Sequence, residues 1–161
     1  MDIRVGFGYD VHRLESGRDF ILGGIKIPHH KGALGHSDAD VLIHAICDAL
    51  LGAANLQDIG AHFSDTDPAY KNIDSKILLA KVLALISDKG FAINNIDSTV
   101  ALQSPKIAPH LAEMKKVLAQ TLNIDTERIS IKASTTEKLG FEGREEGVSA
   151  YAVVLLVRQA H

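Results

Sequence analysis

The sequence is poor in cysteine and has no excess charge of one sign, and each scarcity excludes a class of protein. Its single cysteine, Cys47, cannot form a disulfide within the chain, which argues against a secreted, cross-linked scaffold. The 17 basic and 20 acidic side chains nearly balance, whereas a protein that coats nucleic acid needs a basic surface. The longest wholly apolar run, residues 152–157, is far too short to cross a bilayer.

The remaining composition is that of a folded domain. Hydrophobic residues make up 46% and charged residues 23% of the sequence, which is enough apolar material for a core. The length of 161 residues is near the common size of one domain. Because no repeat or linker divides the chain, we expect one domain over residues 1–161. Asp2 and Arg4 stand where a signal peptide would begin its apolar stretch. We therefore expect a soluble intracellular protein with no nucleic-acid or membrane partner.

Hydrophobic periodicity and turn residues predict alternating strands and helices. Strands are expected over 3–11, 97–103, 129–133 and 148–157, a glycine-turn hairpin over 20–27, and helices over 37–54, 74–89 and 109–122. This order predicts a two-layer α+β domain, with a mixed four-stranded sheet, a small hairpin and the helices on one face. The last strand is apolar on both sides in its second half, so it is either central in the sheet or buried against another subunit. With helices on one face, the other face of the sheet needs cover, which an oligomer would supply. The long loop 55–73 is expected to be functional.

One strand and one helix carry side chains of the kind that bind metal ions. Asp10 and His12 are two residues apart, so on a strand both side chains point to the same face. In the predicted helix, His44 lies one turn from Asp40 and one turn from Asp48. Two histidines and a carboxylate suit zinc when the fourth position stays open, and the other two aspartates are expected to orient the imidazole. The alternative is a surface helix whose aspartates are solvated and pair with the histidine.

Other segments carry side chains suited to phosphate groups. The hydroxyls of Ser134, Thr135 and Thr136 follow a predicted strand and precede the carboxylate of Glu137. Hydroxyls and backbone N–H groups hold phosphate oxygens, and such a carboxylate can hold a magnesium ion. An ordinary helix N-cap is the alternative, and spacing alone favours it.

Three further candidates have equally plain structural alternatives. Arg144, in a glycine-rich loop, suits a bidentate contact with a phosphate, and Lys106 projects from a backbone that two prolines stiffen. Asp58, close to Gly60, suits a pair of ribose hydroxyls. For Arg144 and Asp58 a solvated loop residue is the commoner case, and for Lys106 the alternative is a plain connector between strand and helix.

Five motifs resemble those of the 2-C-methyl-D-erythritol 2,4-cyclodiphosphate synthases, the cyclising enzymes of non-mevalonate isoprenoid biosynthesis. The motifs occur in order at residues 8–12 (GYDVH), 35–40 (GHSDAD), 58–60 (DIG), 63–68 (FSDTDP) and 135–147 (TTEKLGFEGREEG). The match covers essentially the whole chain without a large insertion. It implies a catalytic domain that forms a homotrimer, with sheets packed around a threefold axis and active sites between neighbouring subunits. It also implies a location in the bacterial cytoplasm, or in the plastid stroma if a transit peptide was removed.

The resemblance also implies roles for individual residues. Asp10, His12 and His44 match the zinc ligands. Glu137 matches the carboxylate that holds a second divalent ion, magnesium or manganese. His36 and Thr135 match catalytic positions, the second of them for transition-state stabilisation. The matched substrate contacts are Ser37, Asp58, Ile59, Gly60, Phe63, Ser64, Asp65, Thr66 and Asp67 at the erythritol and ribose end, Leu102, Gln103, Ser104, Pro105, Lys106, Ile107, Ala108, Ala133, Ser134 and Thr136 in a cytidine pocket, and Phe141 and Arg144 towards the trimer centre.

The implied reaction converts 4-diphosphocytidyl-2-C-methyl-D-erythritol 2-phosphate into the cyclic 2,4-diphosphate and releases CMP. Its nucleophile is already an anion, so no general base is required. Two alternatives remain at this point. One is a zinc-dependent phosphohydrolase that activates water at the open metal position. The other is a non-catalytic trimeric nucleotide-binding module with a structural zinc, for which Cys47 is the one residue that could supply a fourth ligand.

Overall fold

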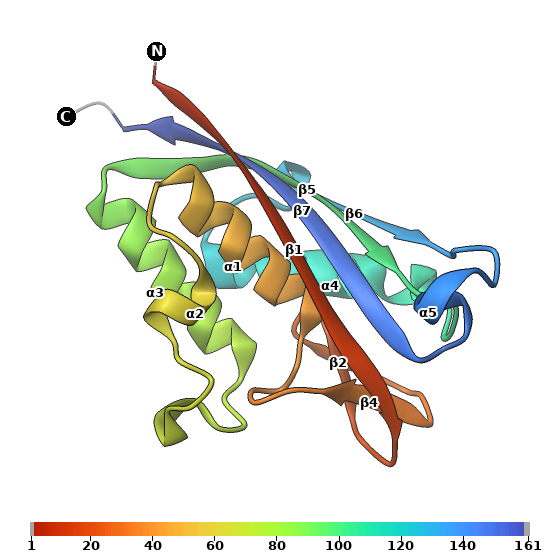
Figure 1. The fold of residues 1–161 in the computed structure, drawn as a ribbon. Helices are drawn as coiled ribbons and strands as arrows, with labels where there is room; N and C mark the ends of the chain where they lie inside the picture. Colours follow the sequence, from red (N-terminus) through yellow and green to blue (C-terminus); the bar gives the residue numbers. More distant parts are fainter. Residues whose placement is uncertain (1, 160–161) are drawn as a thin grey trace.

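A mixed sheet forms one layer of the molecule in the computed structural model, which describes residues 2–159 (Figure 1). Its strand order is β4–β1–β7–β5–β6, and β5 and β6 are parallel while the other neighbours are antiparallel. A separate hairpin pairs β2 with β3. The strands are β1 (Ile3–Ser16), β2 (Phe20–Leu22), β3 (Ile25–Ile27), β4 (Lys31–Leu34), β5 (Phe91–Ala101), β6 (Ile129–Ser134) and β7 (Gly147–Arg158).

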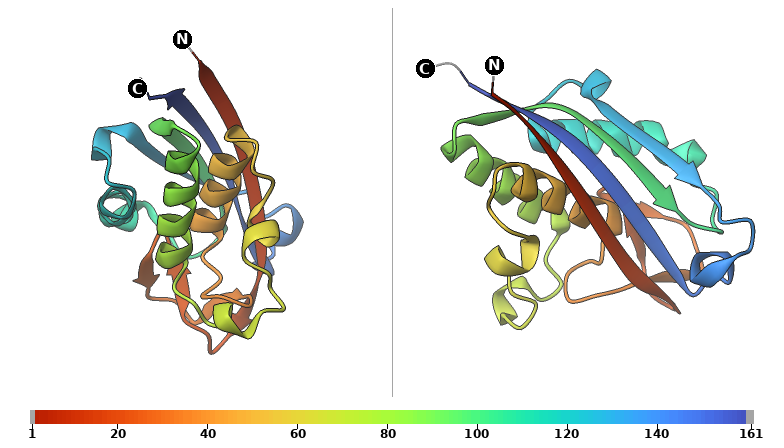
Figure 2. Two further views of the ribbon diagram at one scale, coloured as in Figure 1. Left: turned by 90° about the vertical axis from the view of Figure 1, so that its left-hand side faces the viewer. Right: turned by 45° about the horizontal axis from the view of Figure 1, so that its top comes forward.

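Helices form the second layer and lie on one face of the sheet, as expected (Figure 2). The three long helices are α1 (Val41–Ala53), α3 (Ser75–Asp88) and α4 (Leu111–Leu122). The short ones are α2 (Ile59–His62), α5 (Gly140–Gly143) and the 3₁₀ turns Pro68–Tyr70, Ala108–His110 and Thr126–Arg128. None of the helices described in residues 2–159 is long and apolar enough to cross a membrane. The two-layer α+β prediction is confirmed.

Three details differ from the sequence-based expectations. The sheet has five strands rather than four, because β1 runs on to Ser16 and its extension pairs with the short β4. Helix α1 starts at Val41 rather than near Ser37, because the Asp40 side chain accepts the N–H of Ile43 and caps the helix. The long segment 55–73 contains α2 and a 3₁₀ turn, each begun by an aspartate cap.

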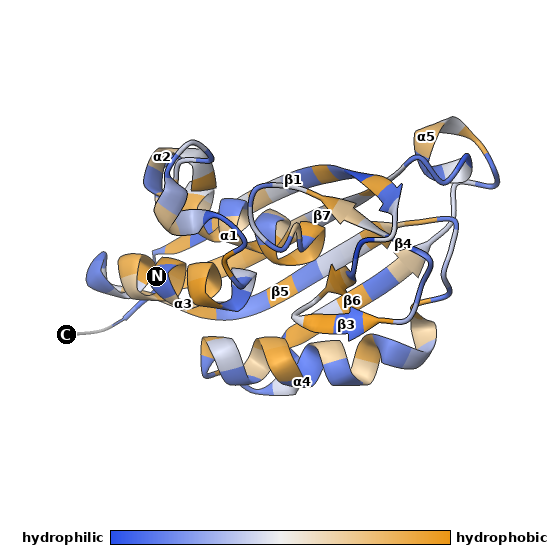
Figure 3. Ribbon diagram, turned by 90° about the horizontal axis from the view of Figure 1, so that it is seen from below, coloured by the Kyte–Doolittle hydropathy of each residue, from blue (hydrophilic) through white to orange (hydrophobic). Residues whose placement is uncertain are grey.

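Helix α1 occupies the centre of the core. Most of its residues are buried, whereas α4 buries one stripe and exposes the rest, so that apolar and polar residues alternate along it in Figure 3. The α1 side chains pack on β1 and β7, between the sheet and α3. This position makes α1 a rigid support for any side chain that it turns towards the sheet edge.

The outer face of the sheet carries a row of exposed apolar side chains. On β1 the exposed fraction is 68% for Val5 and 63% for Phe7, and Tyr9 is also exposed. Tyr151 and Val153 of β7 lie directly across from Tyr9 and Phe7. The strand alternation places these side chains opposite α1, where the chain itself does not cover them. Contiguous apolar surface of this kind usually marks an interface.

Two glycines allow α1 to lie directly on β1. Gly6 and Gly8 are buried on the inner face of the strand. A Cβ atom at Gly8 would overlap the carbonyl oxygen of Ala45, and one at Gly6 would overlap that of Ala49. Only residues without a side chain permit such a close approach of two backbones. The approach brings His44, next to Ala45 in sequence, up to the strand.

We expect Gly8→Ala to destabilise the protein by about 1 to 3 kcal/mol, the usual cost of overpacking a core. The free energy of unfolding from urea titration measures the effect. Gly52→Ala is the matched control, because Gly52 lies on α1, the helix that Gly8 contacts, but is exposed and has open space at its Cβ position. Alanine there should stabilise the helix by up to about 1 kcal/mol. Equal stability of Gly8→Ala and the wild type would contradict the proposed contact.

Candidate metal centre and adjoining cavity

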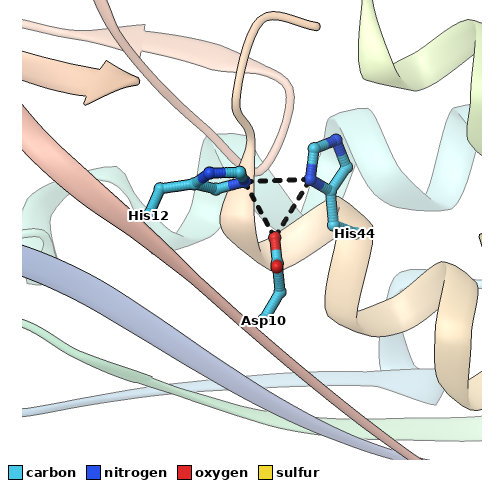
Figure 4. A group of neighbouring side chains, drawn as sticks. All are labelled: Asp10, His12 and His44. Atoms are coloured by element: carbon cyan, nitrogen blue, oxygen red, sulfur yellow. Dashed lines mark hydrogen bonds and ion pairs between the residues drawn. The ribbon is translucent and has the colours of Figure 1, made fainter. Parts of the chain in front are cut away.

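Three side chains from β1 and α1 converge on one point (Figure 4). Asp10 Oδ2 lies 2.9 Å from His12 Nε2 and 3.0 Å from His44 Nδ1, and the two ring nitrogens are 3.1 Å apart. Within the described residues these are the three side chains grouped closely enough to hold a metal ion. Two ligands of a tetrahedral zinc ion are about 3.3 Å apart, given bonds of about 2.0 to 2.2 Å. The triangle therefore fits such an ion with little adjustment.

The hydrogen-bonding partners of the histidines leave electron pairs facing one another. His12 Nδ1 lies 3.0 Å from the carbonyl oxygen of Leu34, which can only accept, so this nitrogen carries the proton and donates it. When its ring carries this single proton, His12 turns an electron pair on Nε2 towards Asp10 and His44. Three acceptors that face each other require a positive charge between them. The donor set is therefore suited to a cation.

Asp10 and His44 each shift the pKa of the other towards the charged form. Burial raises the pKa of the Asp10 carboxyl, but without an ion the imidazoles of His12 and His44, when they are protonated, donate hydrogen bonds that outweigh burial and lower this pKa to about 2. Burial alone would lower the pKa of His44, and the nearby carboxylate of Asp10 raises it instead. Asp10 is therefore ionised at neutral pH, and the site attracts positive charge.

The triad opens into a cavity of about 450 Å³. Of the residues that the sequence pointed to, His36, Ser37, Ile59, Gly60, Phe63 and Asp65 line it together with the triad. Asp58 caps α2 beside it, and Asp67 accepts a hydrogen bond from His36 through its carbonyl oxygen. Ser64 and Thr66 bond to each other and are exposed. The open side of the triad therefore faces space of the size that small ligands occupy.

A second, separate cavity of about 130 Å³ is lined by residues that the sequence resemblance assigns to a cytidine pocket. It is lined by Leu102, Gln103, Pro105, Lys106, Ile107, Ala108, Ala133, Ser134 and Thr135. Ser104 belongs to the same loop, and Thr136 follows β6, where its hydroxyl donates to the carbonyl oxygen of Leu139. In one copy of the chain, the two predicted halves of a substrate site thus form two cavities rather than one.

Glu137, Phe141 and Arg144 do not line either of these two cavities. Glu137 has a positive φ of 53° and contacts Thr135, and it is not grouped with the metal triad. The guanidinium of Arg144 is paired with Glu146 at 2.9 Å on the surface, close to Phe141 of α5.

The expected role of Asp40 and Asp48 is wrong. Asp40 is completely buried and accepts the N–H groups of Gly23 and Gly24 as well as that of Ile43, because it caps α1 instead of lying within it. Asp48 accepts the N–H of Ile59.

The partners of His44 were not expected from the sequence. Its Nε2 atom contacts the hydroxyls of Ser37 and Ser75. Ser75 follows an ordinary helix-capping aspartate, so no sequence spacing marks it. Cys47 is buried outside the triad, which leaves three protein ligands. The further cavity residues that sequence reasoning did not single out are Gly35, Tyr70, Ile73 and Leu78.

A mixed α+β fold with a three-ligand metal site that opens into a cavity defines a candidate metalloenzyme of small-molecule metabolism. The model of the YgbB family matches residues 3–157, and the chain belongs to this family. A Parabacteroides distasonis protein named 2-C-methyl-D-erythritol 2,4-cyclodiphosphate synthase is 65% identical over 158 residues, which are 98% of this chain and 98% of that one.

Solved structures agree with this assignment. The bifunctional IspDF of Campylobacter jejuni has a TM-score of 0.94 and 43% identity over 98% of this chain, which corresponds to 42% of that longer protein. The IspF of Plasmodium falciparum, solved as a CDP complex, has a TM-score of 0.87 and 36% identity over 98% of this chain and 97% of that one.

We expect His44→Ala to lose its bound divalent metal and to remain folded, because the substitution removes one of three ligands but leaves the helix core intact. Elemental analysis after dialysis against zinc measures the metal content, and circular dichroism measures the fold. His30→Ala is the control, since His30 is exposed and is not grouped with the triad. Wild-type metal content in His44→Ala would exclude His44 as a ligand.

Proposed function

We propose that this chain is a 2-C-methyl-D-erythritol 2,4-cyclodiphosphate synthase. It converts 4-diphosphocytidyl-2-C-methyl-D-erythritol 2-phosphate into the cyclic diphosphate and CMP. The observation that carries the proposal is the three-ligand centre that opens into the cavity of His36 and Ser37. The end-to-end similarity to proteins of that name supports it. We further propose that residues 1–161 act as one catalytic domain in the cytoplasm, as expected for relatives of bacterial origin.

The reaction requires positioning and charge neutralisation more than acid–base chemistry. An oxygen of the 2-phosphate attacks the β-phosphorus, a new P–O bond forms, and the bond from the β-phosphorus to the bridging oxygen breaks. CMP leaves with that oxygen and the electron pair. The nucleophile is an anion at neutral pH, so the chain has no proton to remove from it.

The chain's own residues place the two phosphates. Ser37 and His36, on the loop before α1, line the cavity beside the triad and are suited to hold the phosphorylated erythritol. When bound, zinc at the triad and magnesium or manganese at Glu137 supply the positive charge that this phosphoryl transfer needs. Thr135, at the end of β6, is suited to donate a hydrogen bond to the reacting phosphate from a neighbouring subunit.

We propose that the active site lies between subunits of a homotrimer. The cavity of about 130 Å³ around Lys106 is too small for a nucleotide on its own and is separate from the triad, so the cytidine and the erythritol phosphate need two copies of the chain. The exposed apolar row on β1 and β7 supplies a surface on which copies can associate, with the sheets around a threefold axis.

The activity can be tested by phosphorus NMR of the purified protein with the diphosphocytidyl substrate in ¹⁸O-labelled water. We expect signals of the cyclic diphosphate and CMP, no ¹⁸O in either product, and loss of turnover when a chelator removes the divalent ions. A phosphohydrolase would instead give linear phosphates that contain ¹⁸O, and a binding module would give no product. Either result would contradict the proposal.

We expect Phe7→Asp to dissociate the trimer, because it places a charge in the middle of the apolar row. Light scattering after size exclusion should show three copies of the 17.3 kDa chain for the wild type and smaller species for the variant. Ile77→Asp is the matched control, since Ile77 is 49% exposed on α3, away from the sheet face. An intact trimer in Phe7→Asp would place the interface elsewhere.

A further inference from the structure

A buried chain of hydrogen bonds begins at the side of His44 that faces away from the triad. His44 Nε2 lies 3.0 Å from Ser75 Oγ and 3.0 Å from Ser37 Oγ. The Ser75 hydroxyl donates to Asp38 Oδ1 at 2.5 Å, while Asp38 Oδ2 accepts the backbone N–H of Ser75 at 3.0 Å. Ser75 is completely buried at the start of α3. Asp38 is thus linked to the metal site through one serine.

The carboxylate at the end of this chain fixes the direction of each proton. An ionised Asp38 can only accept, so the Ser75 hydroxyl gives its proton to Asp38. The Ser75 oxygen can then only accept from His44, which requires that the neutral imidazole carries its proton on Nε2. The electron pair of His44 is therefore on Nδ1, the atom that faces Asp10 and His12.

The same reasoning determines the orientation of Ser37. Its oxygen accepts the N–H of Ala39 at 3.2 Å and lies within reach of the Nε2 proton of His44. Because Nε2 carries a proton, the Ser37 hydroxyl cannot donate to it. The hydroxyl proton of Ser37 is left for an acceptor in the cavity that this residue lines.

We propose that Asp38 and Ser75 are positioning residues of the metal centre, which hold His44 with its proton on Nε2. His44 Nδ1 is thereby kept free to bind the ion, and the Ser37 hydroxyl is free to donate to a substrate phosphate. Histidine ligands commonly donate their second ring N–H to a carboxylate or carbonyl, and loss of such a partner lowers metal affinity about 10- to 100-fold. The inference rests on the proposed metal centre and not on the reaction.

The test compares zinc affinity and the state of His44 in the wild type and in Ser75→Ala. Competition with a chromophoric chelator should give a zinc dissociation constant about tenfold or more higher for the variant. Nitrogen-15 NMR of the metal-free wild type, at a pH high enough that His44 is neutral, should show its proton on Nε2. In Ser75→Ala the same spectrum should show a mixture of both tautomers, because Ser37 can then donate to Nε2.

Ser98→Ala is the matched control, since Ser98 is also buried and donates one hydrogen bond, to the carbonyl oxygen of Ser130, far from the metal site in sequence. It should keep wild-type zinc affinity. Zinc affinity of Ser75→Ala within twofold of the wild type would overturn the proposal. So would a wild-type spectrum with the proton on Nδ1, a result that needs no variant. Loss of zinc affinity in Ser75→Ala without any cyclisation by the wild type would contradict the proposed reaction and still support this role.

Discussion

The contact between helix α1 and the glycine face of β1 is the constraint on which the metal centre depends. Gly6 and Gly8 let the two backbones touch, and the same strand then presents Asp10 and His12 to His44 across the contact. The three ligand atoms lie about 3 Å from one another, so a shift of the helix by the width of a methyl group would separate them. The ligands are therefore placed by rigid elements, which hold a site more precisely than loops do.

The chain assembles an electrostatically incomplete site. It packs the ionised Asp10 against two imidazoles whose electron pairs face it, and the partners of those imidazoles, Leu34 and Ser75, fix the rings in place. Without a cation between them, these buried acceptors lack a partner, and their close approach costs free energy. Because the unfolded chain has no preformed site, an ion bound at this triad would contribute directly to the stability of the fold.

Much of this could be predicted from the sequence, because the strand alternation at Asp10 and His12, weak by itself, is joined by His44 on a helix and by five motifs in order. The helices and the two-layer fold followed from periodicity. The short strand β4 did not, since its four residues do not alternate and it is defined only by the extended β1. The role of Asp40 depended on where α1 begins, and that of Ser75 on a contact across 31 positions of sequence, which no local pattern encodes.

The separation of the two cavities has a genetic consequence. In the proposed trimer, each site takes its metal side from one subunit and its nucleotide side from the next. A chain damaged at His44 and a chain damaged at Lys106 are each inactive alone, but a ring that contains both has one junction where the two intact halves meet. Coexpression of the two defective alleles should therefore restore part of the lost activity, whereas a site built entirely from one subunit would be broken in every chain of such a mixed ring.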